Sequence, residues 1–146
     1  VVHLLFECWV ELNARGGEYG NVLQAAAWQG TKSVAWLLLV HGAAVNAQGG
    51  HFGNPLQAAA WQGKESVLQL LLERGAQVNA PGAFYSNVLQ VAASEGKQSV
   101  VQLLLKHGAD LNALGGECGN ALPAAKTWGY LSIVQLLLKH GASRNI

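Results

Sequence analysis

The chain has 146 residues, enough for one domain, and a formal net charge of +1 at neutral pH. So small a charge provides no strong field to attract nucleic acid or an anionic membrane, and we expect neither as a partner. Charged residues make up only 12% of the chain and hydrophobic residues 51%, which suits an array of units with a continuous interior.

A pattern of 33 residues repeats along the whole chain. The pair Asn-Ala opens each copy, at Asn13, Asn46, Asn79 and Asn112, and Asn145 begins another. A fixed period of this length, without insertions, predicts a stack of similar units rather than a globular enzyme fold. We expect the second helix of a partial unit at 1–12 and full units at 13–45, 46–78, 79–111 and 112–144, in an excerpt of a longer protein.

Each full unit is expected to begin with a turn and a short helix. In the unit 46–78 the turn covers residues 48–53, which include three glycines. Asn54 stands where a side-chain oxygen can cap a helix, and Pro55 takes the first helical position, where its missing N–H costs nothing. Gly63 ends the helix. Small residues share one phase of these helices and allow them to approach closely, at Ala26, Ala59, Ala92 and Ala125.

A longer helix should follow in each unit, beginning near Lys64 in the second. Its leucines form a broad apolar stripe, and its last turn carries a basic residue followed by glycine, as the C-terminal end of a helix favours. Three histidines occupy that basic position one or more whole repeats apart, at His41, His107 and His140. His3 and His51 have no ligand-forming neighbours at metal-binding spacing, so we predict no metal site. Bulky second helices and small first helices predict a curved stack with the first helices on its concave side.

The repeated segments resemble the ankyrin repeat family. The resemblance rests on L-x-x-A-A-x-x-G at 56–63, V-x-x-L-L-L-x-x-G-A at 67–76 and V-N-A at 78–80, and it extends over the whole chain. It implies an all-α solenoid of stacked helix-turn-helix units with turn or hairpin tips. Where that family has Thr-Pro-Leu-His, these units have Asn-x-Leu-Gln, in which Asn can cap the helix and Gln can link neighbouring loops. The fourth unit departs further, with Pro123 in place of Gln, and we expect it to pack less regularly.

The glycine-rich form of these units also resembles arrays in large fungal proteins, including the sensor regions of NACHT-type signalling ATPases. Proteins with ankyrin repeats usually bind other proteins through their turn tips and the concave face of the first helices. On this chain the tips are Glu18, Tyr19, His51, Phe52, Phe84, Tyr85, Glu117 and Cys118. The concave positions before the glycine are Trp28, Gln29, Trp61, Gln62, Ser94, Glu95, Thr127 and Trp128. These positions vary between otherwise similar units, so the fold does not dictate them.

The aromatic residues among these positions have two interpretations. Trp28 and Trp61 are either partner anchors one repeat apart or a cover over the alanine surface of the neighbouring unit, and both roles are compatible. Tyr19, Phe52 and Tyr85 share one phase, which favours a structural role in which each ring packs on the next turn. Trp36 lies in a second helix and should face the convex side.

The motifs of common enzymes are missing from the sequence. It contains no G-x-S-x-G, H-E-x-x-H or C-x-x-C, and Gly63-Lys64 lacks the earlier glycine of a phosphate-binding loop. We therefore predict a non-enzymatic, monomeric module that needs no cofactor and binds another protein or another domain of its parent chain. The alternative is a structural spacer or an autoinhibitory or sensor arm of a larger signalling protein.

The two cysteines favour a reducing, intracellular setting, and we expect the protein in the cytoplasm. Cys8 and Cys118 lie more than three repeats apart. Because stacked helices are spaced ~8–10 Å apart, the two thiols should be roughly 30 Å from each other, too far for a disulfide. Cysteines that cannot pair within a chain are typical of intracellular proteins.

Overall fold

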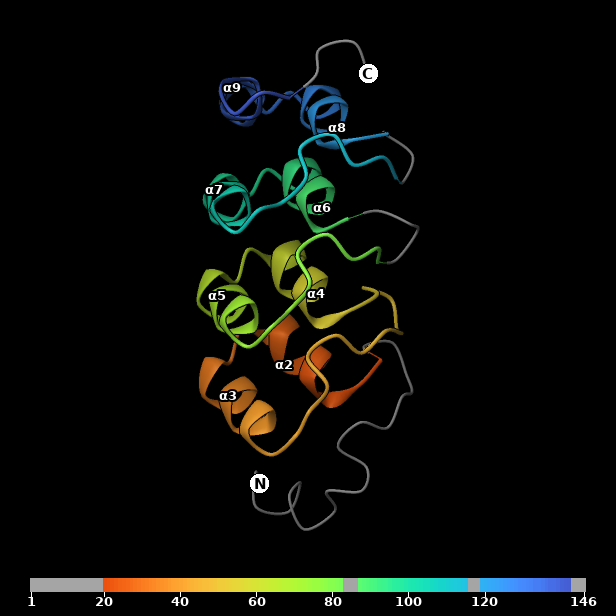
Figure 1. The fold of residues 1–146 in the computed structure, drawn as a ribbon, viewed down its shortest axis with the longest axis vertical. Helices are drawn as coiled ribbons and strands as arrows, with labels where there is room; N and C mark the ends of the chain where they lie inside the picture. Colours follow the sequence, from red (N-terminus) through yellow and green to blue (C-terminus); the bar gives the residue numbers. More distant parts are fainter. Residues whose placement is uncertain (1–19, 83–86, 116–118, 143–146) are drawn as a thin grey trace.

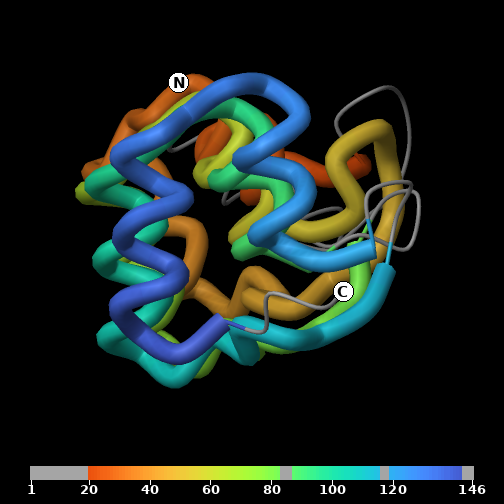
Figure 2. Tube along the Cα trace, turned by 90° about the horizontal axis from the view of Figure 1, so that it is seen from above, coloured from red at the N-terminus to blue at the C-terminus, as the bar shows by residue number. Residues whose placement is uncertain are grey.

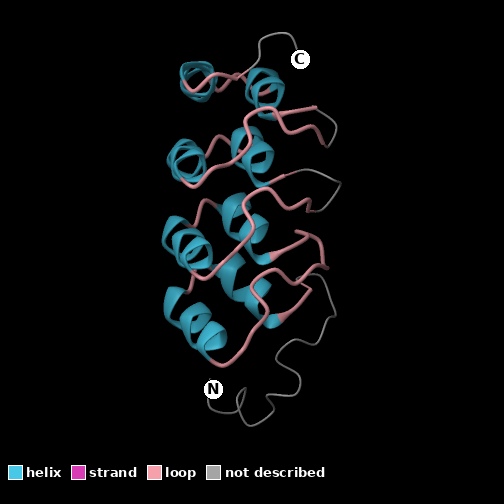
Figure 3. Cartoon of the chain, in the orientation of Figure 1, coloured by secondary structure: helices cyan, strands magenta, loops and turns pink. Residues whose placement is uncertain are grey.

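The protein is a column of stacked helix pairs. A computed structural model describes residues 20–82, 87–115 and 119–142, so the expected helix at 1–12 lies outside the described residues. The described part is helical without strands, which confirms the all-α class (Figures 1 and 3). The first helices of the four units are α2 (Val22–Gln29), α4 (Pro55–Gln62), α6 (Val88–Ser94) and α8 (Ala121–Thr127). The second helices are α3 (Lys32–Val40), α5 (Glu65–Glu73), α7 (Gln98–Lys106) and α9 (Leu131–Lys139).

The helices form two layers along the column. Each first helix packs against the first helix of the next unit, and the second helices stack in the same order. The view along the column shows the units nearly superposed, with the connecting turns on one side (Figure 2). Two of these turns are closed by bridges between glycines, in which Gly49 N donates to Gly53 O at 2.8 Å and Gly115 N to Gly119 O at 2.7 Å.

Asparagine caps every first helix in the described part, as predicted. The Oδ1 atoms of Asn21, Asn54 and Asn87 accept from the backbone N–H three residues later, at 2.8–2.9 Å. In the fourth unit that position is Pro123, which has no N–H to donate. Asn120 therefore accepts from Leu122 N at 3.2 Å instead, and its buried Nδ2 has no hydrogen-bond partner. The expected irregularity of this unit begins at its cap.

Histidine closes three of the second helices. His41 Nδ1 donates to the carbonyl oxygen of Leu37 at 2.8 Å, and His107 and His140 make the same contact with carbonyls four residues earlier. A glycine with positive φ follows each of them. These contacts satisfy carbonyl groups that the end of a helix leaves without partners. The predicted role of these histidines at helix ends is confirmed.

One continuous apolar core runs through the column. The alanines of the first helices and a leucine from each second helix are fully buried in it, including Ala59, Ala92, Ala125, Leu38, Leu71, Leu104 and Leu137. The first helices contact one another more extensively than the second helices do, as the small alanine side chains predict. The curvature of the stack remains a prediction.

Glutamine joins neighbouring units, also as predicted. Gln24 Nε2 donates to Gly49 O of the next unit at 2.8 Å, and Gln90 Nε2 donates to Gly115 O at 2.6 Å. The amide of Gln57 lies against Gly82 and leaves no space there for a Cβ atom. Because the three glutamines are almost fully buried, each link is shielded from competition by water.

A second polar link comes from the asparagine of the Asn-Ala pair. Asn46 Nδ2 donates to Gly75 O at 3.2 Å, and its Oδ1 accepts from Gln77 N at 2.9 Å. Asn79 makes the same two contacts with Gly108 O and Asp110 N. The side chain thus joins the start of each 33-residue unit to the loop at its end, which explains why this asparagine recurs with the period of the stack.

We predict that Gln90→Ala lowers the free energy of unfolding by about 2–3 kcal/mol. The substitution removes the link to Gly115 and the contact in which Gln90 Oε1 accepts from Asn87 N at 3.1 Å, and it leaves a buried void. Gln102→Ala is the matched control, because Gln102 is exposed on α7 and should change stability by less than about 0.5 kcal/mol. Urea denaturation of both variants measures the difference, and equal midpoints would contradict the role of this link.

Candidate functional site

Four aromatic rings from two adjacent units form a cluster beside the first helices. Trp28 ends α2, His51 and Phe52 lie in the turn before α4, and Trp61 is near the end of α4. The rings of Trp28 and Phe52 are stacked, with centroids 4.2 Å apart and planes inclined by 19°. Phe52 meets Trp61 edge to face at 5.8 Å. The Phe52 ring thus connects the first helices of two units.

The cluster has a buried centre and an accessible rim. Phe52 is only 3% exposed, whereas both tryptophans are half-buried and pack against the core. His51 is exposed and meets the Phe52 ring at 88° with a centroid distance of 5.0 Å. Gln29 and Gln62 follow the two tryptophans and are exposed as well. The rim therefore combines apolar ring surface with uncharged hydrogen-bonding groups.

This geometry joins the two interpretations of the aromatic residues. Trp28 packs on the turn of the next unit, so a packing role is present, and its remaining surface is still accessible. Phe52 has the expected structural role through a different contact, because it lies between two tryptophans rather than on the next turn. Phe52 is only 3% exposed, so the two tryptophans and His51 provide most of the accessible ring surface, and the partner contact that the resemblance implied for Phe52 stays a prediction.

The other predicted contact residues do not extend the cluster. Ser94 and Thr127 occupy the tryptophan position in the third and fourth units, and their hydroxyls donate to carbonyls of their own helices at 3.0 and 2.8 Å. Glu95 is half-buried at the end of α6, and Trp128 is exposed at the end of α8. The remaining predicted contacts lie outside the described residues; these are Glu18, Tyr19, Phe84, Tyr85, Glu117 and Cys118.

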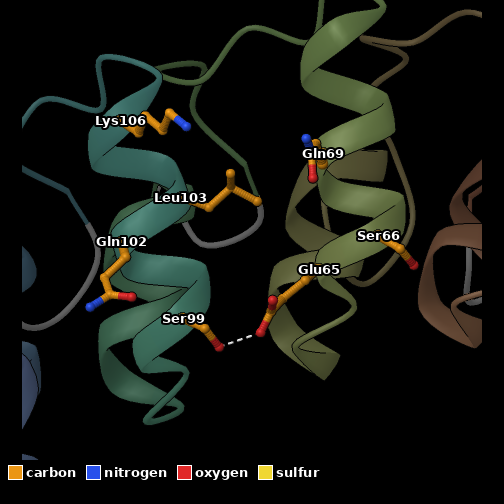
Figure 4. A pocket seen from close by; sticks show the side chains of 7 residues that line it. All are labelled: Glu65, Ser66, Gln69, Ser99, Gln102, Leu103 and Lys106. Carbon is orange, nitrogen blue, oxygen red and sulfur yellow. Dashed lines mark hydrogen bonds between the residues drawn. The ribbon is translucent and has the colours of Figure 1, made fainter.

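A polar groove on the opposite face was not predicted. It lies between the second helices α5 and α7, with a volume of about 490 Å³, and Glu65 and Ser99 hydrogen-bond across it (Figure 4). The other residues that line it are Ser66, Gln69, Gln102, Leu103 and Lys106. No His, Cys or Asp lines the groove. It arises between units, where the 33-residue pattern indicates no contact.

The helix junctions also contain contacts that the sequence reasoning missed. The stem of Lys64 covers Gly30 of the preceding unit, and Lys97 covers Gly63 in the same way. Tyr130 occupies this position in the fourth unit, with its ring against Gly96. A comparison of the four units position by position would have identified this series.

Two absences concern the described residues alone. Within ranges 20–82, 87–115 and 119–142, no group of three His, Cys, Asp or Glu side chains is placed to hold a metal ion. None of the helices described is both long enough and apolar enough to cross a membrane.

We predict that Trp28→Ala destabilises the protein by about 2 kcal/mol. The change removes the ring that stacks on Phe52 and exposes that buried side chain to water. Trp36→Ala is the control, because Trp36 is 45% exposed on α3 and should shift stability by less than about 0.5 kcal/mol. Thermal unfolding followed by circular dichroism compares them. If the two variants unfolded at the same temperature, Trp28 would have no packing role.

Comparison with known proteins bears on the origin of this arrangement. A family model described as ankyrin repeats (3 copies) matches residues 1–82 and again 80–146, and so covers the whole chain. No curated protein matches the sequence. The narrower resemblance to fungal NACHT-type arrays stays a prediction. Ankyrin repeats are generally protein–protein interaction modules and are typically not enzymes. The period, the paired helices and the family match together show that this chain belongs to the ankyrin repeat family.

Proposed function

We propose that this chain is a non-catalytic module that binds another protein, or another domain of its parent chain, through the rim of the aromatic cluster. The rim consists of Trp28, Trp61 and His51 with Gln29 and Gln62. The observation that carries the proposal is the accessible surface of two tryptophans held around a buried ring. Tryptophan is among the residues that contribute most to binding at protein interfaces.

The cluster is suited to binding because its rings are already fixed. The stack of Trp28 on Phe52 restricts the indole, and the core beneath holds Trp61. A partner that covers these rings therefore loses little additional side-chain entropy on binding. The surface is also supported by helices of two adjacent units rather than by a single loop, which limits its movement.

The composition of the rim defines the partner's chemistry. The two tryptophans, His51 and the two glutamines include no carboxylate, lysine or arginine. A complementary surface would contribute apolar side chains to cover the indoles and uncharged polar groups to bond the glutamine amides. Charge attraction would have little part in binding at this rim, so affinity should change little with ionic strength.

A second candidate function is a structural spacer or an autoinhibitory or sensor arm. The specific observation in its favour is that Phe52 already covers one face of Trp28, so the aromatic residues contribute to the stack itself. In either role we infer a monomer. We also infer a reducing, cytoplasmic setting, because Cys8 and Cys118 are widely separated along the array.

We predict that Gln29→Glu together with Gln62→Glu abolishes capture of the partner from a cell lysate. The two carboxylates would stand beside the tryptophans and would have to be desolvated in the complex. The fold should tolerate them, because Glu95 occupies the same position in the third unit. The measurement is affinity capture with the purified chain, followed by identification of the retained proteins.

The matched control is Gln69→Glu with Gln102→Glu, two exposed glutamines that line the groove between α5 and α7. It adds the same charge to the opposite face and should retain the same partner. If this control fails to capture the partner while the Gln29 and Gln62 variant still captures it, the binding site is the groove. Identical captures by all three proteins, or no capture at all, would favour the spacer or arm.

A further inference from the structure

Three apolar side chains are exposed at the junction of α8 and α9. Trp128 is 63% exposed, Tyr130 37% and Leu131 73%. They follow one another around the turn at Gly129, and we call them the junction patch. It belongs to a different unit from the aromatic cluster and shares no residue with its rim. It is the largest grouping of exposed apolar side chains within one turn of the described chain.

The three residues of the junction patch all differ from the residues at the same positions of the second and third units. The second unit has Gln62, Lys64 and Glu65 at the positions of Trp128, Tyr130 and Leu131. The third unit has the polar residues Glu95, Lys97 and Gln98 there. The fold is therefore built equally well with polar side chains at all three positions. Neither capping nor core packing accounts for apolar residues at positions 128 and 131.

Stacking of another unit does not explain the patch either. α6 and α7 stack directly on α4 and α5, yet Gln62 and Glu65 remain exposed in that interior unit. A unit stacked in the same way on α8 and α9 would therefore leave Leu131 exposed and would cover Trp128 only in part, since Glu95 at its position in the third unit is half-buried. Tyr130 points back to the preceding unit, where a Cβ atom at Gly96 would come within 2.7 Å of its ring. The patch faces sideways from the column, with the Tyr130 ring as its fixed base.

The size of the patch favours a small occupant over a second copy of the chain. The exposed parts of the three side chains amount to about 400 Å², within the range of the largest apolar patches on monomers, which are often functional. A stable dimer covers roughly 800 Å² on each partner, about twice this area. One or two large side chains of a short segment would cover the patch.

The charges around the patch favour an acidic occupant. Lys126 is exposed on α8 two residues before Trp128, whereas Lys97, at the position of Tyr130 in the preceding unit, is half-buried with its stem over Gly63. The one carboxylate at the equivalent positions of that unit is Glu95, which is half-buried. At 126 the other units have buried alanines, so the positive charge is also peculiar to this unit.

We propose that the junction patch docks a short linear segment of another protein, in which a large apolar side chain is flanked by Asp or Glu. The apolar side chain would lie against Trp128 and Leu131 beside the Tyr130 ring, and the acidic flank would meet Lys126. The patch lies in a different unit from the rim of the aromatic cluster, so the module has two binding sites.

The test is selection from a displayed library of random 12-residue peptides on the immobilised chain. The key variant, W128Q with Y130K and L131E, restores the residues of the second unit and is expected to keep its helicity. Enriched peptides should combine aromatic or aliphatic residues with Asp or Glu. Their affinity, measured by fluorescence anisotropy, should fall at least about tenfold in the variant, a loss of about 1.4 kcal/mol. Binding to the variant Gln29→Glu with Gln62→Glu should be unchanged.

Lys126→Ala provides an independent measurement, because alanine is the residue of the other three units at this position. It should weaken the acidic peptides several-fold and reduce the dependence of their affinity on salt. If the triple variant loses helicity, L131E alone replaces it, since Glu65 shows that the position accepts glutamate.

Four outcomes would overturn the proposal. They are no enrichment above an unrelated protein, peptides that bind the triple variant equally well, a dimer by sedimentation that the triple variant abolishes, and vesicle binding without peptide binding. The vesicles would contain phosphatidylcholine with one-fifth phosphatidylserine by mole, a roughly physiological anionic surface.

Discussion

The structure depends on the fact that none of the helices in the described part of the chain is long enough to be stable alone. They have seven to nine residues, whereas isolated helices shorter than about 12–15 residues are marginal in water. Each helix must therefore bury its apolar face against its partner and against the units on both sides. The period follows from this requirement, because identical neighbours can be stacked only if every unit presents the same two faces. The clearest example is the alanine shared by all four first helices, Ala26, Ala59, Ala92 and Ala125, since a larger side chain at this position would separate two units.

Apolar burial does not by itself determine how far one unit is shifted along the next. The buried glutamines do so, because each must find a carbonyl of the following loop. The asparagines of the Asn-Ala pair add exposed contacts between successive loops. A shifted unit would leave the glutamine amides buried without partners, which is costly. Polar residues in this core thus specify one register, while the alanines and leucines provide most of the favourable free energy. The fourth unit departs from this scheme at Pro123, where both the cap contact and the glutamine link are lost.

Most of the fold could be predicted from the sequence because its polar contacts recur at fixed positions of the 33-residue unit. The caps at Asn21, Asn54 and Asn87, the glycine ends and the glutamine links all follow from side-chain chemistry at those positions. The site was harder to predict because its aromatic residues do not recur in every unit. Phase placed Phe52 at a turn tip and Trp28 in a first helix, but it could not show that one ring would be buried under the other. The groove between α5 and α7 was missed for the same reason, since it depends on how two second helices sit side by side.

Departures from the repeat differ in meaning according to where the structure places them. Trp28 and Trp61 stand where other units have small residues, and the Phe52 ring packs against both indoles, so part of their apolar surface is buried within the fold. Trp128 and Leu131 have no such compensation, because their rings and methyl groups remain in water while equivalent polar residues serve the other units well. In a repeat protein the interior units act as internal controls for what the fold requires. Where the interior units show that the fold does not need an exposed apolar side chain, that side chain points to a contact with another molecule. A half-buried ring that already packs on another ring of the same chain is weaker evidence for such a contact.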